Sequence, residues 1–328
     1  MIYRTLIWGI ALFLVEIVIV LAAYTYGRYQ SPSGILVEDG EDVAPYVRDR
    51  EGLALYAEAL GAIEKNYVDQ EALDSEKQAY GAIEGMIDSL GDEGHTRFLT
   101  SEEVEKTRDA VSDKHAGASW NLIPGTDVAH LWLALFSKNA AKDLEEAIIQ
   151  AQETGAERFV LDLRDNKGGL VNQAEKAAAQ FLPTGSEIYT RKDVDGMKEN
   201  VVPEGNEPLD APLVVLVNGE SASSAEIVAG ALRDNDRARI VGGTTFGTGT
   251  VLDEYTLSDG SAVLLAVAEW LTPRGDSIQD SGIEPDVEVK LEENQKPRVP
   301  DGNEDLAREE IFAEDVQLER AFEILQEG

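Results

Sequence analysis

PLVVLVNGESASSAEIVAGALR, residues 212–233, is the stretch that decides the fold. Its first six residues form an apolar run of the length and branching typical of a strand buried on both faces. A turn of small and polar residues follows. From Ser224 to Arg233 the apolar residues recur at helical spacing. A buried strand that leads directly into a helix indicates an α/β sheet covered by helices.

The same alternation of strands and helices extends in both directions from this stretch. Arg158–Leu163 (RFVLDL) reads as a second buried strand, and it ends in the glycine pair Gly168-Gly169. The remaining predicted elements of the core are a strand over Val128–Phe136, helices over Lys142–Thr154 and Leu170–Phe181, and strands over Arg239–Val241 and Ala262–Trp270. The sequence therefore predicts an α/β core over residues 127–291.

Two junctions between strands and loops carry candidate chemistry. Adjacent glycines at Gly168 and Gly169 allow a sharp turn that points backbone N–H groups outward, as one half of an oxyanion hole requires. Ser223 lies where a helix begins, so its hydroxyl sits at the positive end of the helix and the N–H of Ser224 is a second donor. Taken singly, these residues are better explained by a glycine turn that caps a strand and by an N-cap serine.

Together, the ordered motifs resemble the carboxyl-terminal processing peptidases, also called tail-specific proteases. The resemblance runs from about Glu51 to the C-terminus. It rests on these segments, in chain order: Tyr67-Val68-Asp69, GDEGHTRFL at 91–99, LDLR at 161–164 with Gly168-Gly169, Ser221-Ala222-Ser223, Thr245-Phe246-Gly247, Gly249-Thr250-Val251, LTPRG at 271–275, GIEPD at 282–286 and QLER at 317–320.

Membership implies a ClpP/crotonase-like α/β core and cleavage of proteins near their C-termini. It places the nucleophile on Ser223 and the oxyanion donors on the backbone of Gly168 or Gly169 and of Ser224. It also implies a lysine base, because a desolvated lysine can be neutral near pH 7 and accept the serine proton. Protein or peptide substrates would be the ligands.

The sequence departs from that pattern in three places. Thr248 stands where the lysine is expected, and Leu252 stands where many members carry a glutamine that orients it. Residues 114–126 form only a short connection where a PDZ domain is expected, too short for a folded domain. We therefore expect a homologue with lost or much reduced proteolysis and a binding or regulatory role, in association with an intact relative.

Two alternatives remain open. The chain is a working serine peptidase if another base, such as Lys167 or His95, replaces the lysine. A crotonase-like acyl-thioester enzyme would share the fold and its backbone oxyanion hole, although the ordered peptidase motifs argue against it.

The N-terminal part reads as an anchor and a linker. Leu6–Tyr24 contains 19 residues with a single charge, Glu16, long enough to cross a bilayer. We expect an uncleaved anchor at 1–27 and a linker at 28–50, with the soluble part outside the cytoplasm on a single-pass membrane protein; a cleaved signal peptide is the alternative. A helical region at 51–113 follows, and an acidic segment with a helix at 292–328 closes the chain.

Composition restricts the remaining functions. Sixty-three acidic residues against 28 basic ones give a formal net charge of −35, which repels nucleic acid. The chain has no cysteine and three histidines, at positions 95, 115 and 130. Neither a metal site nor a cofactor motif is expected.

Overall fold

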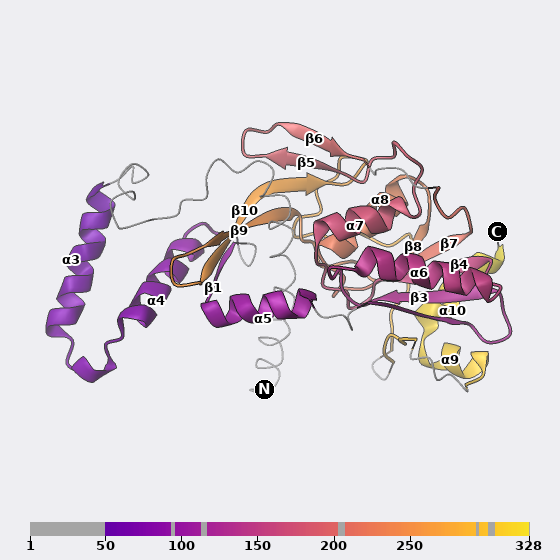
Figure 1. Cartoon of the computed structure of the whole chain (residues 1–328), viewed down its shortest axis with the longest axis horizontal. Helices are drawn as coiled ribbons and strands as arrows, with labels where there is room; N and C mark the ends of the chain where they lie inside the picture. Colours follow the sequence, from indigo (N-terminus) through magenta and orange to yellow (C-terminus); the bar gives the residue numbers. More distant parts are fainter. Residues whose placement is uncertain are drawn as a thin grey trace.

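The computed structural model describes residues 50–92, 96–112, 117–202, 207–292, 295–300 and 306–327. It contains two β-sheets with helices packed around them (Figure 1). The predicted anchor at 6–24 and nearly all of the predicted linker lie outside the described residues. Among the helices within those ranges, none has the length and apolar character needed to span a bilayer.

A six-stranded sheet forms the centre of the core. Five of its strands, β3, β4, β7, β8 and β11, run parallel to one another, and β2 pairs antiparallel with β3 at one edge. In spatial order the strands are β11 (Val287–Glu288), β8 (Arg239–Gly242), β7 (Leu213–Val217), β4 (Arg158–Asp162), β3 (Val128–Leu133) and β2 (Ala118–Leu122). The predicted α/β sheet covered by helices is confirmed, and β7 lies beside β4 near its middle.

Successive residues of β7 pack against opposite faces of this sheet, as the period of a strand requires. Leu213, Val215 and Val217 belong to the larger apolar cluster. That cluster includes residues of α6 (Ala140–Glu153), α7 (Val171–Ala179) and α8 (Ser224–Asp234). Val214 and Leu216 face the other side, where α9 (Arg308–Glu314) and α10 (Val316–Glu327) pack. Figure 1 shows α6, α7 and α8 grouped together, and α9 and α10, in yellow, on the other side of the sheet.

The C-terminal segment differs from its prediction. It contains two helices, separated at Asp315, where one acidic helix was expected. Its apolar residues, among them Ile311, Leu318 and Ile324, are buried in the second cluster against the sheet. The segment is therefore part of the core, because most of its acidic residues lie on the solvent-facing side of amphipathic helices, while Asp315 between the helices is buried.

A second sheet extends from the core toward the N-terminal helices. It has the order β1-β10-β5-β6, and β9 also pairs with β10. Its strands are β1 (Arg97–Leu99), β5 (Tyr189–Asp193), β6 (Lys198–Val201), β9 (Thr250–Thr256) and β10 (Ala262–Leu271). Only β10 was predicted. The short strands β1, β5 and β6 carry too few apolar residues to be recognised by pattern alone.

The N-terminal region contains α3 (Arg50–Asn66), a 3-10 turn η2 (Gln70–Ala72), α4 (Ser75–Asp88) and α5 (Ser101–Ser112). In Figure 1, α3 lies farthest from the two sheets, whereas α4 packs against β1, where the rings of Tyr80 and Phe98 are in contact. At the start of α5, Thr100 and Glu103 exchange the reciprocal hydrogen bonds of a capping box.

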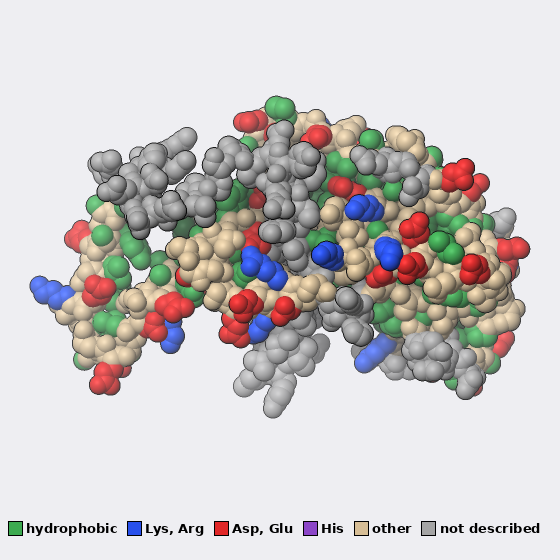
Figure 2. All heavy atoms as spheres, in the orientation of Figure 1, with side chains coloured by type: hydrophobic (Ala, Val, Ile, Leu, Met, Phe, Trp, Pro, Cys, Tyr) green, Lys and Arg blue, Asp and Glu red, His purple; other side chains and the backbone are tan. Residues whose placement is uncertain are grey.

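Strand β2 lies inside the stretch predicted as a mere connection. It pairs with β3 over Ala118–Leu122, so the core sheet begins before residue 127. The interval between α5 and this strand is reduced to residues 113–117. Figure 2 shows acidic side chains spread over the visible face of the molecule, as expected for a solvated, strongly acidic surface.

Candidate active site

Ser223 lies at the sharp turn between β7 and α8, as the sequence predicts. It is the N-cap residue of α8, with φ 53° and ψ −115°. A non-glycine residue in such a conformation costs about 1–3 kcal/mol and persists only where its surroundings enforce it. The Ser221 hydroxyl helps to do so, because it donates a 2.7 Å hydrogen bond to the carbonyl of Leu163 at the end of β4.

Gly168 lies directly against Ser223. A Cβ built on Gly168 would lie 2.8 Å from the Cβ of Ser223 and 3.1 Å from the N of Ser224. Only glycine allows this approach, and its φ of 98° also favours glycine. The two loops meet because they follow adjacent parallel strands, whose carboxyl ends share one edge of the sheet.

Asn166 holds the glycine loop in place. Its Nδ2 donates to the carbonyl of Leu133 at 2.6 Å, and its Oδ1 accepts from the N–H of Gly168 at 2.8 Å. Its own carbonyl accepts from the N–H of Ala222, next to Ser223. Asn166 therefore ties together three segments of the site. Sequence reasoning missed it, and its place between Arg164 and the glycine pair was the only signal.

Because the N–H of Gly168 is used by Asn166, Gly169 and Ser224 are the remaining candidates for oxyanion donors. Their backbone N–H groups make no hydrogen bond to any part of the chain that the structure describes. The Ser224 hydroxyl donates to the carbonyl of Gly169 at 2.8 Å and so fixes the two residues together. Gly168 and Gly169 were both candidates for an oxyanion donor. The geometry favours Gly169, because the N–H of Gly168 is already bound by Asn166.

Glu226 is the residue that organises the other side of the site. It is fully buried, one turn into α8. Its Oε2 accepts from the N–H of Ser223 and of Thr248, both at 2.8 Å. Its Oε1 accepts from the Thr245 hydroxyl and from the N–H of Gly247 at 2.7 Å. Burial raises the pKa of this carboxyl, although the four hydrogen bonds oppose that effect. The spacing of Ser223 and Glu226 matches a capping box, which was a usable sequence signal.

Thr248 is buried beside this carboxylate, in the loop that leads into β9. Its carbonyl accepts a 2.7 Å hydrogen bond from the indole N–H of Trp270. The backbone nitrogens of Ser223 and Thr248 each donate to Oε2 of Glu226 at 2.8 Å, so the two nitrogens lie close together. The side chain of residue 248 therefore begins close to that of Ser223.

Leu252 lies in β9, paired with Ala266 of β10. Its side chain belongs to a separate small apolar cluster, whose other buried members are Leu99, Val104, Ala262 and Leu264. Leucine thus fits the surroundings of this position.

Of the suggested replacement bases, Lys167 makes no hydrogen bond to Ser223 in the described part of the chain. Lys167 forms an ion pair with Glu220. His95 lies outside the described residues. His130 is buried, with Nε2 2.9 Å from a carboxylate oxygen of Asp162. In the part of the chain that the structure describes, no hydrogen bond joins the Ser223 hydroxyl to a lysine or histidine side chain.

A buried ionic cluster supports the stem of the glycine loop. The guanidinium of Arg164, fully buried, binds the carboxylates of Asp162 and Asp315 at 2.6 and 2.7 Å. Burial disfavours the charged form of Asp162, but Arg164 and His130 outweigh it and lower its pKa to about 2. For Arg164, burial is likewise outweighed by the two aspartates, and its pKa is raised. The C-terminal helices are thereby linked to the end of β4.

No group of acidic and histidine side chains suited to a metal ion occurs among the described residues.

Residues 127–289 match peptidase family S41. A carboxyl-terminal-processing protease of Synechocystis is 42% identical over 51% of this chain and 39% of its own length. Another, of Picosynechococcus, is 36% identical over 72% of this chain and 58% of its own length. The chain therefore spans between about two fifths and three fifths of the length of these two relatives.

A solved lipoprotein structure from Streptococcus agalactiae has the same fold, with a TM-score of 0.56, 18% identity and coverage of 74% of this chain and 86% of that one. The chain belongs to peptidase family S41, through a domain that contains both junctions described above.

Proposed function

We propose that this protein is a membrane-anchored homologue of the carboxyl-terminal processing serine endopeptidases, in which proteolysis is lost or much reduced and binding remains. One observation carries the proposal. Position 248, held beside Ser223 through Glu226, provides a hydroxyl where the family resemblance calls for an amine. A threonine hydroxyl is about as acidic as a serine hydroxyl, so it cannot take up the serine proton at neutral pH.

Binding does not require that proton transfer. Gly169 and Ser224 present unused N–H groups beside Ser223, in the described part of the chain, and such donors can hold a peptide carbonyl oxygen. The names of the relatives, which are carboxyl-terminal-processing proteases, support a protein or peptide as the ligand. A non-cleaving member of this kind would regulate or present ligands to an intact relative.

Attachment to the membrane rests on the apolar run Leu6–Tyr24. It would tether the peptidase-like domain to the outer side of the cell membrane as a single-pass protein. N-terminal sequencing of the natural protein tests this, since a mature start at Thr25 or beyond would indicate a cleaved signal peptide.

A working peptidase with a different base is the second candidate. The enforced conformation of Ser223 favours it, because a strained nucleophile turn is typical of active hydrolases. Lys167 would first have to leave Glu220.

Reactivity with a fluorophosphonate probe separates the two. We expect the full chain to resist labelling as Ser223→Ala does, while Thr248→Lys becomes labelled at Ser223. Stoichiometric labelling of Ser223 in the unmodified protein would establish the working peptidase instead.

A further inference from the structure

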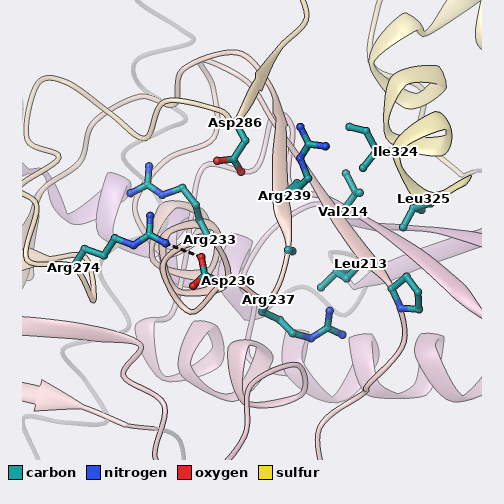
Figure 3. A pocket seen from close by; sticks show the side chains of 12 residues that line it. Leu213, Val214, Arg233, Asp236, Arg237, Arg239, Arg274, Asp286, Ile324 and Leu325 are labelled. Atoms are coloured by element: carbon teal, nitrogen blue, oxygen red, sulfur yellow. Dashed lines mark hydrogen bonds and ion pairs between the residues drawn. The ribbon is translucent and has the colours of Figure 1, made fainter. Parts of the chain in front are cut away.

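A separate cavity lies at the opposite edge of the six-stranded sheet. It has a volume of about 660 Å³ and opens where β7 and β8 begin, between the end of α8 and the end of α10 (Figure 3). Arg233, on its wall, is ten residues along α8 from Ser223, which corresponds to roughly 15 Å of helix. The cavity is therefore distinct from the candidate active site, and its volume is in the range of small-molecule sites.

Positive charge gathers here although the chain carries a net charge of −35. Four arginines and two aspartates line the cavity. Two of the arginines are neutralised, since Arg233 pairs with Asp234 and Arg274 pairs with Asp236, both at 2.8 Å. Asp286, the second lining aspartate, accepts a 2.7 Å hydrogen bond from the backbone of Ile240.

The other two arginines have no carboxylate within ion-pair distance among the described residues. Arg237 uses Nε and Nη2 to bind three backbone carbonyls, which fixes its guanidinium, and the Asp210 carboxylate acts on its charge from beyond ion-pair distance. Arg239, the first residue of β8, is exposed and makes no side-chain hydrogen bond to the described chain. An arginine without an ion-pair partner, such as Arg239, can bind a carboxylate through its guanidinium group.

The remaining wall is aliphatic. Leu213, Ile324 and Leu325 line it, and the carbonyl of Leu325 is held at 3.0 Å by Arg158. In Figure 3 these side chains lie on one side of the cavity, Arg233, Arg274 and Asp286 lie on the other, and Arg239 stands between them. A ligand that meets both surfaces needs one anionic end and one short apolar end.

We propose that this cavity binds a small organic acid, with its carboxylate on Arg239 and its aliphatic chain against Leu213, Ile324 and Leu325. The planar fork of a guanidinium matches a carboxylate in two parallel hydrogen bonds. Burial of the chain against the aliphatic wall adds about fourfold in affinity for each methylene group. The site does not depend on whether Ser223 is active.

Calorimetric titration of the full chain with hexanoate tests this proposal. We expect binding of hexanoate, binding of acetate weaker by more than tenfold, and no binding of hexan-1-ol, which has the chain without the charge. Arg239→Ala should weaken hexanoate binding by roughly tenfold to a hundredfold, and Arg239→Glu should abolish it. Arg108→Ala, which removes a surface arginine on α5 paired with Glu254, is the matched control and should bind like the unmodified protein.

Arg239 is exposed, so its substitution should leave the thermal unfolding midpoint unchanged, and this measurement accompanies each titration. Three results would each overturn the proposal. They are no heat of binding with millimolar hexanoate, equal binding by the Arg239 variants and the unmodified protein, and tighter binding of inorganic phosphate than of hexanoate.

Discussion

Ser223 and Thr248 are joined through one atom, because the Oε2 of Glu226 accepts a 2.8 Å hydrogen bond from the backbone N–H of each. The turn that carries the candidate nucleophile and the loop that would carry its base are thus fixed relative to one another by a buried carboxylate on α8. The backbone of the site is in place while the side chain at 248 is a threonine.

Replacing Glu226 with glutamine should loosen both segments. The amide can accept at only one of its two terminal atoms, so buried N–H groups lose their partner, at a cost of about 1–3 kcal/mol in the free energy of unfolding. Urea unfolding of the unmodified protein and of Glu226→Gln measures this difference in the free energy of unfolding. Glu157→Gln, at an exposed position, is the control and should change stability by less than about 0.5 kcal/mol.

The cost of Glu226→Gln should also depend on pH. Burial raises the pKa of Glu226 in the folded protein, so the folded state binds more protons than the unfolded one above the ordinary value of about 4.3. Wild-type stability then falls as pH rises toward the raised pKa, by up to about 1.4 kcal/mol per pH unit, and the glutamine variant lacks this slope. The difference between the two proteins should therefore shrink from pH 4 to pH 7, and a difference that grows would contradict the assignment.

Gly168→Ala tests the contact with Ser223. The new methyl group would meet the Ser223 Cβ at 2.8 Å at a φ of 98°, so strain and overpacking together should cost about 2–5 kcal/mol. Gly185→Ala is a close control, since Gly185 has a φ of 92° and no atom within 4 Å of the added carbon. It should cost only about 1–2 kcal/mol. Equal losses in denaturant unfolding would mean that Gly168 does not lie against Ser223.

Arg164→Met should be among the most damaging single changes. It leaves Asp162 and Asp315 buried without their cation, which costs about 3–5 kcal/mol. The exposed pair of Arg108 and Glu254 serves for comparison, and Arg108→Ala should cost less than about 1 kcal/mol. Similar midpoints of chemical unfolding for the two variants would show that the ionic cluster does not fasten the C-terminal helices to the sheet.

The apolar run before Ser223 predicts β7, and the run before Gly168 predicts β4, because strands buried on both faces are the strongest local signal in a chain. Since adjacent parallel strands end at one edge, the meeting of Ser223 with Gly168 follows from the same pattern. The ion pair of Arg164 with Asp315 could not be predicted, because it joins residues 151 positions apart in sequence with no periodic signal between them. The only sequence signal for the role of Glu226 is its capping-box spacing from Ser223.

Leu252 shows how motif matching and packing can differ. Its position was taken from the spacing after residue 248, whereas its side chain lies among Leu99, Val104, Ala262 and Leu264. Leu252→Gln should therefore destabilise the protein by about 1–3 kcal/mol, because a buried amide would lack partners in that cluster. Thermal unfolding of Leu252→Gln beside Leu252→Met measures this, and methionine should cost less than about 1.5 kcal/mol. A glutamine that is tolerated as well as methionine would indicate a polar surrounding.

The most direct test of the central claim is the rate at which the full chain hydrolyses casein or a tail peptide, beside Ser223→Ala and Thr248→Lys. With threonine at position 248, the unmodified protein should be indistinguishable from Ser223→Ala, while Thr248→Lys should gain hydrolysis that disappears when Ser223 is also replaced by alanine. Hydrolysis by the unmodified protein that depends on Ser223 would contradict the account and point to Lys167 or His95 as the base.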